Sequence, residues 1–343
     1  MSATGRVAML VEPRAIELRE EEVPAAPPGG MVVRVRAALT DGTDLKAYRR
    51  GHPKMPMPTR FGHEFSGDVA SVGEGVMAFA PGDAVACTHS APCGSCYWCA
   101  IGEDELCATV IETMILGAYA DYVAVPARVV ARNAFAKPPG ASYAEAAFLE
   151  PLSCVMHSIR LLAPREGSTV AVVGDGGFGI LHALVLARAG VRAVLIGRRA
   201  ERLALARDLG VETIDARTAD DREALLERSG GRGADALVEC TGRAEVWERA
   251  PELVRRGGLV SFFGGLPSGT RVCFDAARLH YDRVRLIAPF HFAPQDVRRA
   301  YDAIAAATIP LARLISHTYP LDAIAEAFAR LDSGDGMKLL IAP

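Results

Sequence analysis

The stretch "STVAVVGDGGFGILHALVLARAG" (residues 168–190) predicts a strand, a glycine-rich turn and a helix in direct succession. The run "TVAVV" is short and apolar, which favours a buried strand, whereas the longer Ala- and Leu-rich run favours a helix. Gly174, Gly176 and Gly179 form a GxGxxG pattern at the turn between them. In this context the first glycine permits a tight turn, the second lets the backbone approach a pyrophosphate, and the third lets helix and strand pack closely. We therefore predict a dinucleotide site whose phosphates meet the helix N-terminus.

The segments that follow alternate between strand and helix patterns. Strands are predicted for residues 191–197, 233–242 and 257–265, and helices for 199–210 and 244–257. This alternation is typical of a parallel, doubly wound sheet. The predicted fold class of this part of the chain is therefore α/β.

The rest of the chain has a different texture. Residues 1–150 contain short apolar stretches, such as "MVVRVRAA" (31–38) and "GDAVAC" (82–87), separated by Gly- and Pro-rich turns, which predicts mostly β structure. From about residue 290 the sequence predicts two helices (293–307 and 321–334) and a last strand (337–343). We therefore expect about two domains, in keeping with the usual size of roughly 150 residues per domain.

Composition argues against several classes of partner. The formal net charge is −3 without a basic block, so we expect no nucleic-acid partner. No apolar run reaches the ~18–20 residues that span a bilayer, so we expect no membrane partner. The N-terminus does not have the pattern of a signal peptide, and we predict a cytoplasmic location. In that compartment the eight cysteines serve as thiols or metal ligands rather than disulfides.

Four of these cysteines lie close together in "PCGSCYWCAIGEDELC" (92–107), with the spacing C-x2-C-x2-C-x7-C. Four thiolates within so short a loop suit a tetrahedral metal site, and zinc is the usual occupant. An iron–sulfur cluster is the main alternative, and a disulfide pair or free thiols are a third interpretation. Because all four ligands are thiolates, the predicted site is closed and structural. Its ligands are Cys93, Cys96, Cys99 and Cys107.

The end of the second predicted strand reads "LIGRRAER" (195–202). An Asp or Glu there would accept a hydrogen bond from the ribose 2′-hydroxyl of NAD, but Gly197, Arg198 and Arg199 stand in that place. Guanidiniums pair with phosphate, so we predict NADP in preference to NAD. In the alternative interpretation both arginines are solvated and Glu201 contacts the ribose. The predicted cofactor-binding residues are Gly174, Gly176, Gly177, Phe178, Gly179, Arg198, Arg199, Thr241 and Gly264.

These motifs, together with three others, follow one another in an order that is similar to one enzyme family. The other three are "GHEFSGDVASVGEGV" (62–76), "GAYADYVAVPA" (117–127) and "FLEPLSCVMHSI" (148–159). The chain resembles the zinc-dependent medium-chain dehydrogenase/reductase family, the alcohol dehydrogenase-like enzymes, and within it the polyol and threonine dehydrogenase branch. The resemblance covers nearly the whole chain.

The resemblance implies a GroES-like, mostly β catalytic domain (1–153 and 290–343) with a structural zinc lobe at about 87–110, and a Rossmann domain (154–289). It also implies a catalytic zinc separate from the structural one, and a homodimer or homotetramer. The implied activity is hydride transfer between a nicotinamide cofactor and a secondary alcohol or its ketone, with a polyol, a sugar or a cyclitol-like compound as the substrate.

The resemblance also assigns ligands to the catalytic zinc. Asp41, in "DGTDLK", stands where the family usually has a cysteine, and the other ligand positions are His63, Glu64 and Glu150. Zinc accepts carboxylate oxygen at about the same distance as imidazole nitrogen, so the replacement keeps a donor. It makes the site harder and more permissive to other divalent ions. Taken alone, Asp41 also fits a turn or a helix cap, and His63 a buried, hydrogen-bonded side chain.

Three residues receive catalytic roles from the resemblance. Thr43 begins a proton relay, Lys46 stands where many relatives have a histidine, and Glu64 supports the ligands or exchanges with Glu150. In the alternative interpretation, the Thr43 hydroxyl caps a helix and Lys46 points to solvent. Three other functions stay open: an L-threonine 3-dehydrogenase, a metal-free reductase of the quinone-reductase type, and a non-catalytic zinc-binding or redox-sensing protein.

Overall fold

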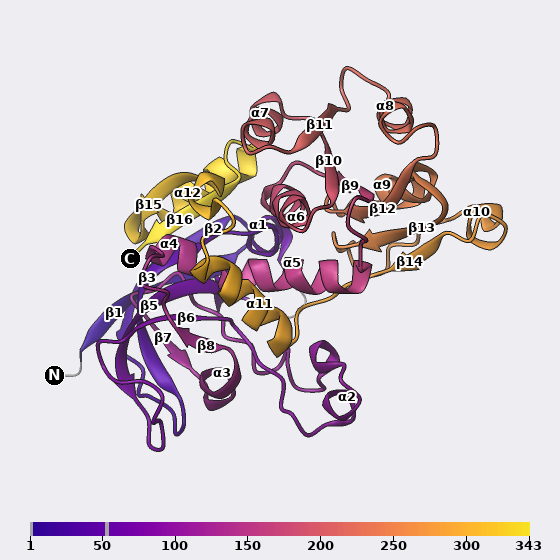
Figure 1. Cartoon of the computed structure of the whole chain (residues 1–343). Coiled ribbons are helices and arrows are strands. Elements are labelled where there is room, and N and C mark those ends of the chain that lie inside the picture. Colours follow the sequence, from indigo (N-terminus) through magenta and orange to yellow (C-terminus); the bar gives the residue numbers. More distant parts are fainter. Residues whose placement is uncertain (1–2, 52–54) are drawn as a thin grey trace. The chain divides into compact units, whose positions relative to one another are not determined.

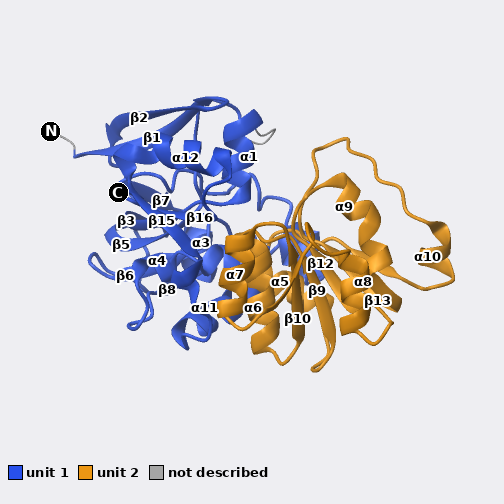
Figure 2. Cartoon of the chain, turned by 90° about the horizontal axis from the view of Figure 1, so that it is seen from above, with its two compact units in different colours: residues 1–153, 292–343 blue, residues 154–291 orange. Residues whose placement is uncertain are grey.

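The computed structural model describes residues 3–51 and 55–343 (Figure 1). The chain divides into two compact units, which Figure 2 shows in different colours. Unit 1 consists of residues 1–153 and 292–343, and unit 2 consists of residues 154–291. The first boundary falls inside helix α5 (Leu149–Leu162). Within the described parts of the chain, no helix is both long enough and apolar enough to cross a membrane.

Unit 2 is built on a six-stranded sheet in which every pairing is parallel. Its strands are β9 (Thr169–Val173), β10 (Arg192–Gly197), β11 (Glu212–Asp215), β12 (Ala234–Glu239), β13 (Val254–Phe262) and β14 (Arg285–Ile287). They are arranged in the order β11-β10-β9-β12-β13-β14, so the chain starts at the centre, moves to one edge, and then returns to build the other half. This is the doubly wound order of a dinucleotide-binding sheet, and the predicted α/β fold is confirmed.

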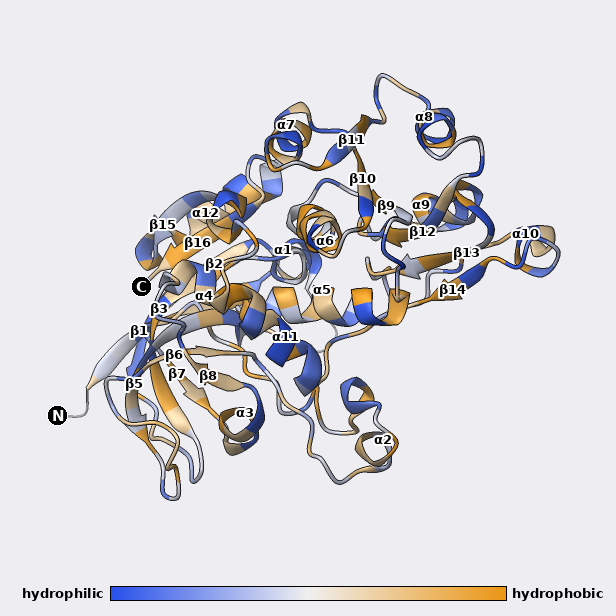
Figure 3. Cartoon of the chain, in the orientation of Figure 1, coloured by the Kyte–Doolittle hydropathy of each residue, from blue (hydrophilic) through white to orange (hydrophobic). Residues whose placement is uncertain are grey.

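This sheet packs against helices because its strands are apolar on both faces, and these helices include α6 (Gly177–Arg188), α7 (Ala200–Asp208) and α8 (Asp221–Arg228). Unit 2 also contains the short helices α9 (Ala244–Arg249) and α10 (Ala276–His280), neither of which has a buried residue. Helix α6 follows β9 directly, and its residues from Gly179 to Leu186 are all buried. Figure 3 shows this helix mostly in the hydrophobic colours. The tight packing of α6 fixes the glycine-rich turn that precedes it.

One predicted helix is wrong in its second half. The sequence pattern predicted a helix over residues 244–257, but α9 ends at Arg249, and a 3₁₀ helix (Ala250–Leu253) leads into β13 at Val254. Pro251 explains the change, because proline has no N–H to donate and its ring clashes with the preceding turn of an α-helix. The apolar residues after it therefore continue as a strand.

Unit 1 contains two sheets. The three-stranded sheet has the order β2-β1-β4, and the larger sheet has the order β15-β16-β3-β5-β6-β8, with β7 also paired to β3. The strands are β1 (Thr4–Glu12), β2 (Ala15–Glu22), β3 (Met31–Leu39), β4 (Thr59–Arg60), β5 (Glu64–Val72), β6 (Ala84–Cys87), β7 (Tyr122–Val125), β8 (Ala134–Ala136), β15 (Ile315–Pro320) and β16 (Lys338–Ala342). This mostly β unit is the predicted GroES-like fold.

Short helices connect these strands. They are α1 (Gly42–Arg50), α2 (Tyr97–Ala100), α3 (Ala127–Arg132), α4 (Tyr143–Ala146), α11 (Pro294–Ala305) and α12 (Ile324–Ser333), together with 3₁₀ helices at Asp104–Leu106, Leu311–Leu314 and Leu321–Ala323. Three buried rings lie at the centre of the core, with Phe61 and Phe328 centroids 5.2 Å apart and Tyr119 within 5.7 Å of both. Such edge and tilted contacts are the preferred arrangements of aromatic side chains.

Register in the larger sheet brings remote residues together. Glu64 begins β5 opposite Leu39 of β3, and β16 pairs with β3 from the other side, with Leu340 opposite Leu39. Lys338, two residues earlier in β16, therefore lies near the end of β3 and the start of α1. Because β3 is central in this sheet, the side chains that surround its end are buried.

Candidate metal centres and dinucleotide site

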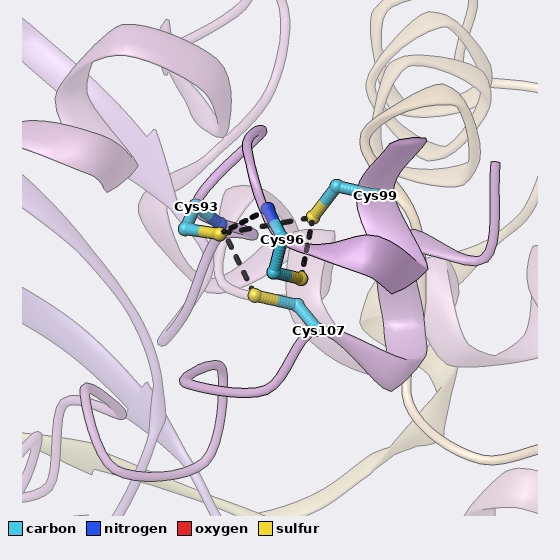
Figure 4. Close-up of side chains that lie close together, drawn as sticks. All are labelled: Cys93, Cys96, Cys99 and Cys107. Carbon is cyan, nitrogen blue, oxygen red and sulfur yellow. Dashed lines mark hydrogen bonds between the residues drawn. The ribbon is translucent and has the colours of Figure 1, made fainter. Parts of the chain in front are cut away.

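The four cysteines of the predicted structural site converge in unit 1, around α2 and the 3₁₀ helix that follows it (Figure 4). The Sγ atoms all lie within 4.8 Å of one another. Cys96 Sγ is 3.6 Å and Cys93 Sγ is 4.0 Å from Cys99 Sγ. Four sulfurs bound at ~2.3 Å around one tetrahedral zinc stand about 3.8 Å apart, so this spacing fits zinc closely. A disulfide requires about 2.05 Å, and all eight cysteines are free.

The thiols also have different proton affinities. Backbone N–H donors from Ser95 and Cys96, with the Ser95 hydroxyl, lower the pKa of Cys93 to about 5. Burial, together with the neighbouring sulfurs, raises the pKa of Cys99 to about 12. Without a cation Cys93 and Cys99 therefore do not ionise together at neutral pH, whereas a bound divalent cation stabilises thiolates. The donor set fits a closed zinc site.

The second cluster begins at Asp41, which is the N-cap of α1. Its Oδ1 accepts hydrogen bonds of 2.8 Å from the backbone N–H groups of Thr43 and Asp44. Asp44 completes a capping box by accepting from the Asp41 N–H. Asp41 therefore caps α1 as the helix-cap interpretation expected, but it does so with only one of its two carboxylate oxygens. The other, Oδ2, lies 3.8 Å from His63 Nε2.

His63 lies just before β5, within ion-pairing distance of a second carboxylate. Its Nδ1 is 3.3 Å from Asp44 Oδ1, while Asp44 Oδ2 accepts a 2.6 Å hydrogen bond from the Tyr119 hydroxyl. Such a carboxylate on one ring nitrogen fixes the orientation of a histidine and directs the other nitrogen toward a ligand. Nε2 of His63 is thereby directed toward the Asp41 carboxylate.

Glu64 and Glu150 complete the cluster. Glu64 is fully buried, and its Oε2 accepts a 2.5 Å hydrogen bond from the ammonium of Lys338, which also donates to Thr40 O at 2.9 Å. Glu64 Oε1 is buried and has no hydrogen-bond partner among the described residues. Glu150, in the first turn of α5, lies 3.2 Å from His89 Nδ1. Donor atoms of His63, Glu64 and Glu150 lie within 4.8 Å of one another, as do those of Asp41, Asp44 and His63.

The electrostatics of this cluster are dominated by excess negative charge. Burial alone would lower the pKa of His63, but the carboxylates of Asp44 and Asp41 raise it well above its ordinary value. Burial raises the pKa of Glu64 despite Lys338, and Asp41 and Glu150 raise it further. Burying several carboxylates together costs free energy unless cations compensate them. The orphaned oxygen of Glu64 and the nearby nitrogen of His63 therefore fit a divalent cation.

The predicted catalytic residues Thr43 and Lys46 both lie on α1. Thr43 is half-buried in the first turn, and its hydroxyl has no hydrogen bond within residues 3–51 and 55–343. The interpretation of that hydroxyl as a helix cap is thus not supported, because Asp41 forms the cap. Lys46 is half-buried.

Sequence reasoning missed several residues of the cluster. His89 follows β6, is 3% exposed, and stacks edge-on with the rings of His63 and Phe292 at 5.1 and 5.7 Å. The one feature of the sequence that could have pointed to His89 is its position, four residues before Cys93. Lys338 gave no signal either, because its partner is 274 residues away in the chain.

The glycine-rich turn of unit 2 has the geometry that a dinucleotide requires. Gly174 has a φ of +118°, a conformation that favours glycine. A Cβ on Gly179 would lie 1.7 Å from the carbonyl oxygen of Gly174, so only glycine lets α6 approach the turn. A Cβ on Gly176 would meet no atom within 4 Å. The space in front of this second glycine is therefore open to an approaching pyrophosphate, and Gly177 and Phe178 form the first turn of α6 behind it.

The predicted residues Thr241 and Gly264 lie in two loops that follow β12 and β13. Glu239, which is fully buried, accepts hydrogen bonds from the N–H and hydroxyl of Thr241 and from the N–H of Gly242. A Cβ on Gly264 would lie 2.4 Å from Gly242 N, so these loops are in close contact. Both follow the carboxyl ends of parallel strands, where ligands bind in such sheets.

Arg198 and Arg199 lie between β10 and α7. Neither guanidinium forms an ion pair within the described parts of the chain. Arg202, one turn into α7, is a third arginine that the prediction omitted. Its pKa is lowered mainly by burial and further by the charge of Arg199, while Asp175 and Glu201 act in the opposite direction. Free guanidiniums at the start of a helix suit a phosphate ligand.

Comparison with known proteins agrees with this architecture. Residues 27–134 match the alcohol dehydrogenase GroES-like domain, and residues 177–306 match the zinc-binding dehydrogenase family. The chain is 30% identical to the D-altritol 5-dehydrogenase of Agrobacterium fabrum, over 94% of this chain and 95% of that protein. It is 32% identical to an L-threonine 3-dehydrogenase of Bacillus velezensis over 70% of each.

Among solved structures, a zinc-binding dehydrogenase of Sinorhizobium meliloti bound to NADP is 30% identical, with a TM-score of 0.91 and full coverage of both chains. These matches cover both units of the chain. The chain therefore belongs to the zinc-dependent medium-chain alcohol dehydrogenase family and is an NAD(P)-dependent oxidoreductase.

Proposed function

We propose that this protein interconverts a secondary alcohol of the polyol or sugar type and its ketone, with NADP as the preferred cofactor. The observation that carries the proposal is the pair of buried clusters that share His63, one with Asp41 and Asp44 and the other with Glu64 and Glu150, in which Lys338 pairs with Glu64. An excess of buried negative charge is the environment of a divalent cation, and the chain's family supplies the reaction type.

In this proposal Asp41 Oδ2, His63 Nε2 and Glu150 hold the catalytic zinc. Bound there, zinc supplies a Lewis acid that lowers the pKa of a substrate hydroxyl. Glu64 lies next to these ligands, and its pairing with Lys338 draws one of its oxygens away from them. The ion pair therefore favours a supporting role for Glu64 rather than permanent ligation.

Thr43 and Lys46 are proposed to conduct the proton. Both project from α1, whose start is fixed by the Asp41 cap next to the cluster. The Thr43 hydroxyl has no hydrogen bond to another described residue, so it is available to a substrate oxygen. Lys46 lies one helical turn further along the same helix. This gives a path from the cluster along α1.

The glycine-rich turn is proposed to hold the pyrophosphate, and Arg198 and Arg199 to pair with the 2′-phosphate of NADP. The nicotinamide cofactor, when bound, takes up or returns the hydride. The NADP bound to the relative from Sinorhizobium meliloti supports this choice. Similarity to an L-threonine 3-dehydrogenase keeps threonine as a second candidate substrate. A screen of polyols, aldoses, cyclitols and threonine with NADP and NAD distinguishes the two.

Metal analysis of Asp41→Ala tests the catalytic site. We expect about two zinc ions per wild-type chain, and loss of one of them together with the activity in the variant. Asp220→Ala is a matched control, because Asp220 caps α8 with the same pair of hydrogen bonds, from Arg222 and Glu223. It should keep both zinc ions and full turnover. The proposal fails if wild type binds a single zinc and Asp41→Ala retains its activity.

We also propose that the chain acts as a homodimer or homotetramer, as the family resemblance implies, and that it is located in the cytoplasm. Light scattering coupled to gel filtration measures the first property. A monomer at micromolar concentration would contradict the proposed assembly without affecting the proposed chemistry.

A further inference from the structure

Asp175, between the first two glycines of the turn, makes a contact that its position in the sequence does not indicate. Its side chain reaches the end of β10, where Oδ2 accepts hydrogen bonds from the backbone N–H of Arg198 at 2.6 Å and of Arg199 at 2.7 Å. Hydrogen bonds to a carboxylate are shorter and stronger than those between neutral groups. A single carboxylate oxygen therefore fixes two consecutive amides of the segment that follows the strand.

Gly197 makes this contact possible. A Cβ on Gly197 would lie 2.6 Å from both the Cβ and the Oδ2 of Asp175. Both distances are far inside van der Waals contact, so any side chain at residue 197 would displace the carboxylate. An acid at the strand end and Asp175 in its present place are thus mutually exclusive. The carboxylate at the end of β10 therefore comes from Asp175 in the glycine-rich turn, and it binds backbone N–H groups.

The amides that Asp175 binds belong to the two arginines that are proposed to meet the 2′-phosphate. Arg199 is the N-cap of α7, and its own side chain makes no capping bond. Asp175 thus does for this segment what a cap residue does for a helix: it orders the backbone from which both side chains extend. The guanidiniums of Arg198 and Arg199 have no ion pair within the described residues, so ordering them leaves their charges available.

We propose that Asp175 is a positioning residue for cofactor selection. It fixes residues 197–199 so that Arg198 and Arg199 meet a 2′-phosphate, and it occupies the place of a strand-end acid that would bind the 2′-hydroxyl of NAD. The inference rests on the proposed preference for NADP. Beyond that proposal, we infer that the preference for NADP depends on the Asp175 carboxylate of the glycine-rich turn as well as on the two arginines.

Two substitutions of Asp175 distinguish the role of its hydrogen-bond acceptor from the role of its negative charge. Asp175→Asn keeps an oxygen that accepts from both amides but removes the negative charge, whereas Asp175→Ala removes the acceptor. Asp208→Ala is the control, because Asp208 is exposed on α7 and makes no hydrogen bond in the described structure. The zinc-loaded enzyme is titrated with NADPH and with NADH, and the dissociation constants are measured by cofactor fluorescence.

For Asp175→Ala we expect binding of NADPH to weaken about tenfold, the effect of roughly one lost charge-assisted hydrogen bond, and binding of NADH to change less than about twofold. Asp175→Asn and Asp208→Ala should stay within about threefold of wild type for both. In the absence of nucleotide, hydrogen exchange of the Arg198 and Arg199 amides should be fastest in Asp175→Ala and intermediate in Asp175→Asn, whose neutral oxygen still accepts from both.

A larger loss for NADH than for NADPH in Asp175→Asn would overturn the proposal, since it would make Asp175 the acceptor of the ribose hydroxyl. Unchanged exchange of both amides in Asp175→Ala would overturn it as well. Failure of the proposed function is seen separately in wild type, as tighter binding of NADH or as no binding of either nucleotide. The exchange measurement needs no nucleotide and still decides whether Asp175 orders this segment.

Discussion

We predict that His182 makes the stability of unit 2 depend on pH. It lies in α6, is 0% exposed, and its ring packs edge-on against Phe263 at 4.6 Å. Nδ1 is 2.8 Å from the carbonyl oxygen of Phe178, and since a carbonyl only accepts, Nδ1 carries the proton. Nε2 is buried without a hydrogen-bond partner in the described structure. Burial lowers the pKa of His182 to about 4, in spite of the Phe178 carbonyl.

The sign and size of the effect follow from linkage. An unfolded histidine has a pKa of about 6.5, so below that pH the unfolded chain binds a proton that the folded chain refuses. The contribution to stability is fully present above about pH 7 and is lost as the pH falls from about 6.5 toward 4. With a folded pKa of about 4, the loss is roughly 2 kcal/mol at about pH 5 and approaches about 3 kcal/mol at lower pH.

Urea unfolding of wild type and His182→Leu at several pH values measures this loss. Leucine keeps an apolar contact with Phe263 and does not titrate. Trp247 lies in unit 2 and Trp98 lies in the cysteine lobe, so a Trp98→Phe background lets fluorescence report unit 2. The difference in unfolding free energy between the two proteins should shift by about 2 kcal/mol in favour of the variant from about pH 7.5 to about pH 5. Losses common to both proteins, such as acid release of zinc, cancel. Parallel pH profiles would refute the reasoning.

Two predictions concern the carboxylate cluster of unit 1, both measured as free energies of unfolding. Tyr119→Phe removes the hydroxyl that binds Asp44 and should cost about 1.5–3 kcal/mol, with a cost near zero contradicting the assigned hydrogen bond. Lys338→Met leaves Glu64 buried without its cation and should cost about 3–5 kcal/mol. Glu64→Gln in the same chain should recover much of that loss, and equal instability of the double variant would show that lost packing, not charge, is responsible.

The sequence predicted unit 2 well because its signals are local. The strand, the turn and the helix from residue 168 to 190 are consecutive, and the closest approach there, between Gly179 and the Gly174 carbonyl, joins residues only five positions apart. The failure at residues 250–257 has the same local origin, since Pro251 was present in the pattern and its effect on the helix was underestimated. Periodicity alone therefore gives the elements, and proline decides where they end.

The catalytic cluster was predicted less completely because its contacts are remote. Asp41, His63 and Glu150 come from motifs, but which atoms they use is set by partners in other strands. His89 and Lys338 are such partners, and no pattern in the sequence links either one to its carboxylate. Sheet register creates these pairs, because β5 and β16 flank β3 from opposite sides. Sequence spacing contains no information about that register.

Contacts between residues that are remote in sequence also explain why the sequence predicted no carboxylate at the end of β10. From the sequence, Gly197 marks the absence of an acid, and the structure shows that a carboxylate is nevertheless present, on Asp175. A glycine and an aspartate 22 residues apart form one feature, since the first makes room for the second. The residue at the strand end does not by itself show whether a carboxylate is absent there or is supplied by the glycine-rich turn.

Asp41 takes part both in a local contact, the cap of α1, and in a contact with a residue remote in sequence, His63. An aspartate has two oxygens, and here Oδ1 caps α1 while Oδ2 faces His63. The alternatives of a helix cap and a metal ligand therefore do not compete, because they use different atoms. A cysteine in this position has a single sulfur and would be a much weaker cap for the backbone N–H groups of Thr43 and Asp44. Replacing a thiolate with a carboxylate thus couples the proposed zinc ligand to the start of α1, the helix that bears Thr43 and Lys46. We therefore expect loss of the Asp41 carboxylate to affect the start of α1 as well as the proposed zinc site.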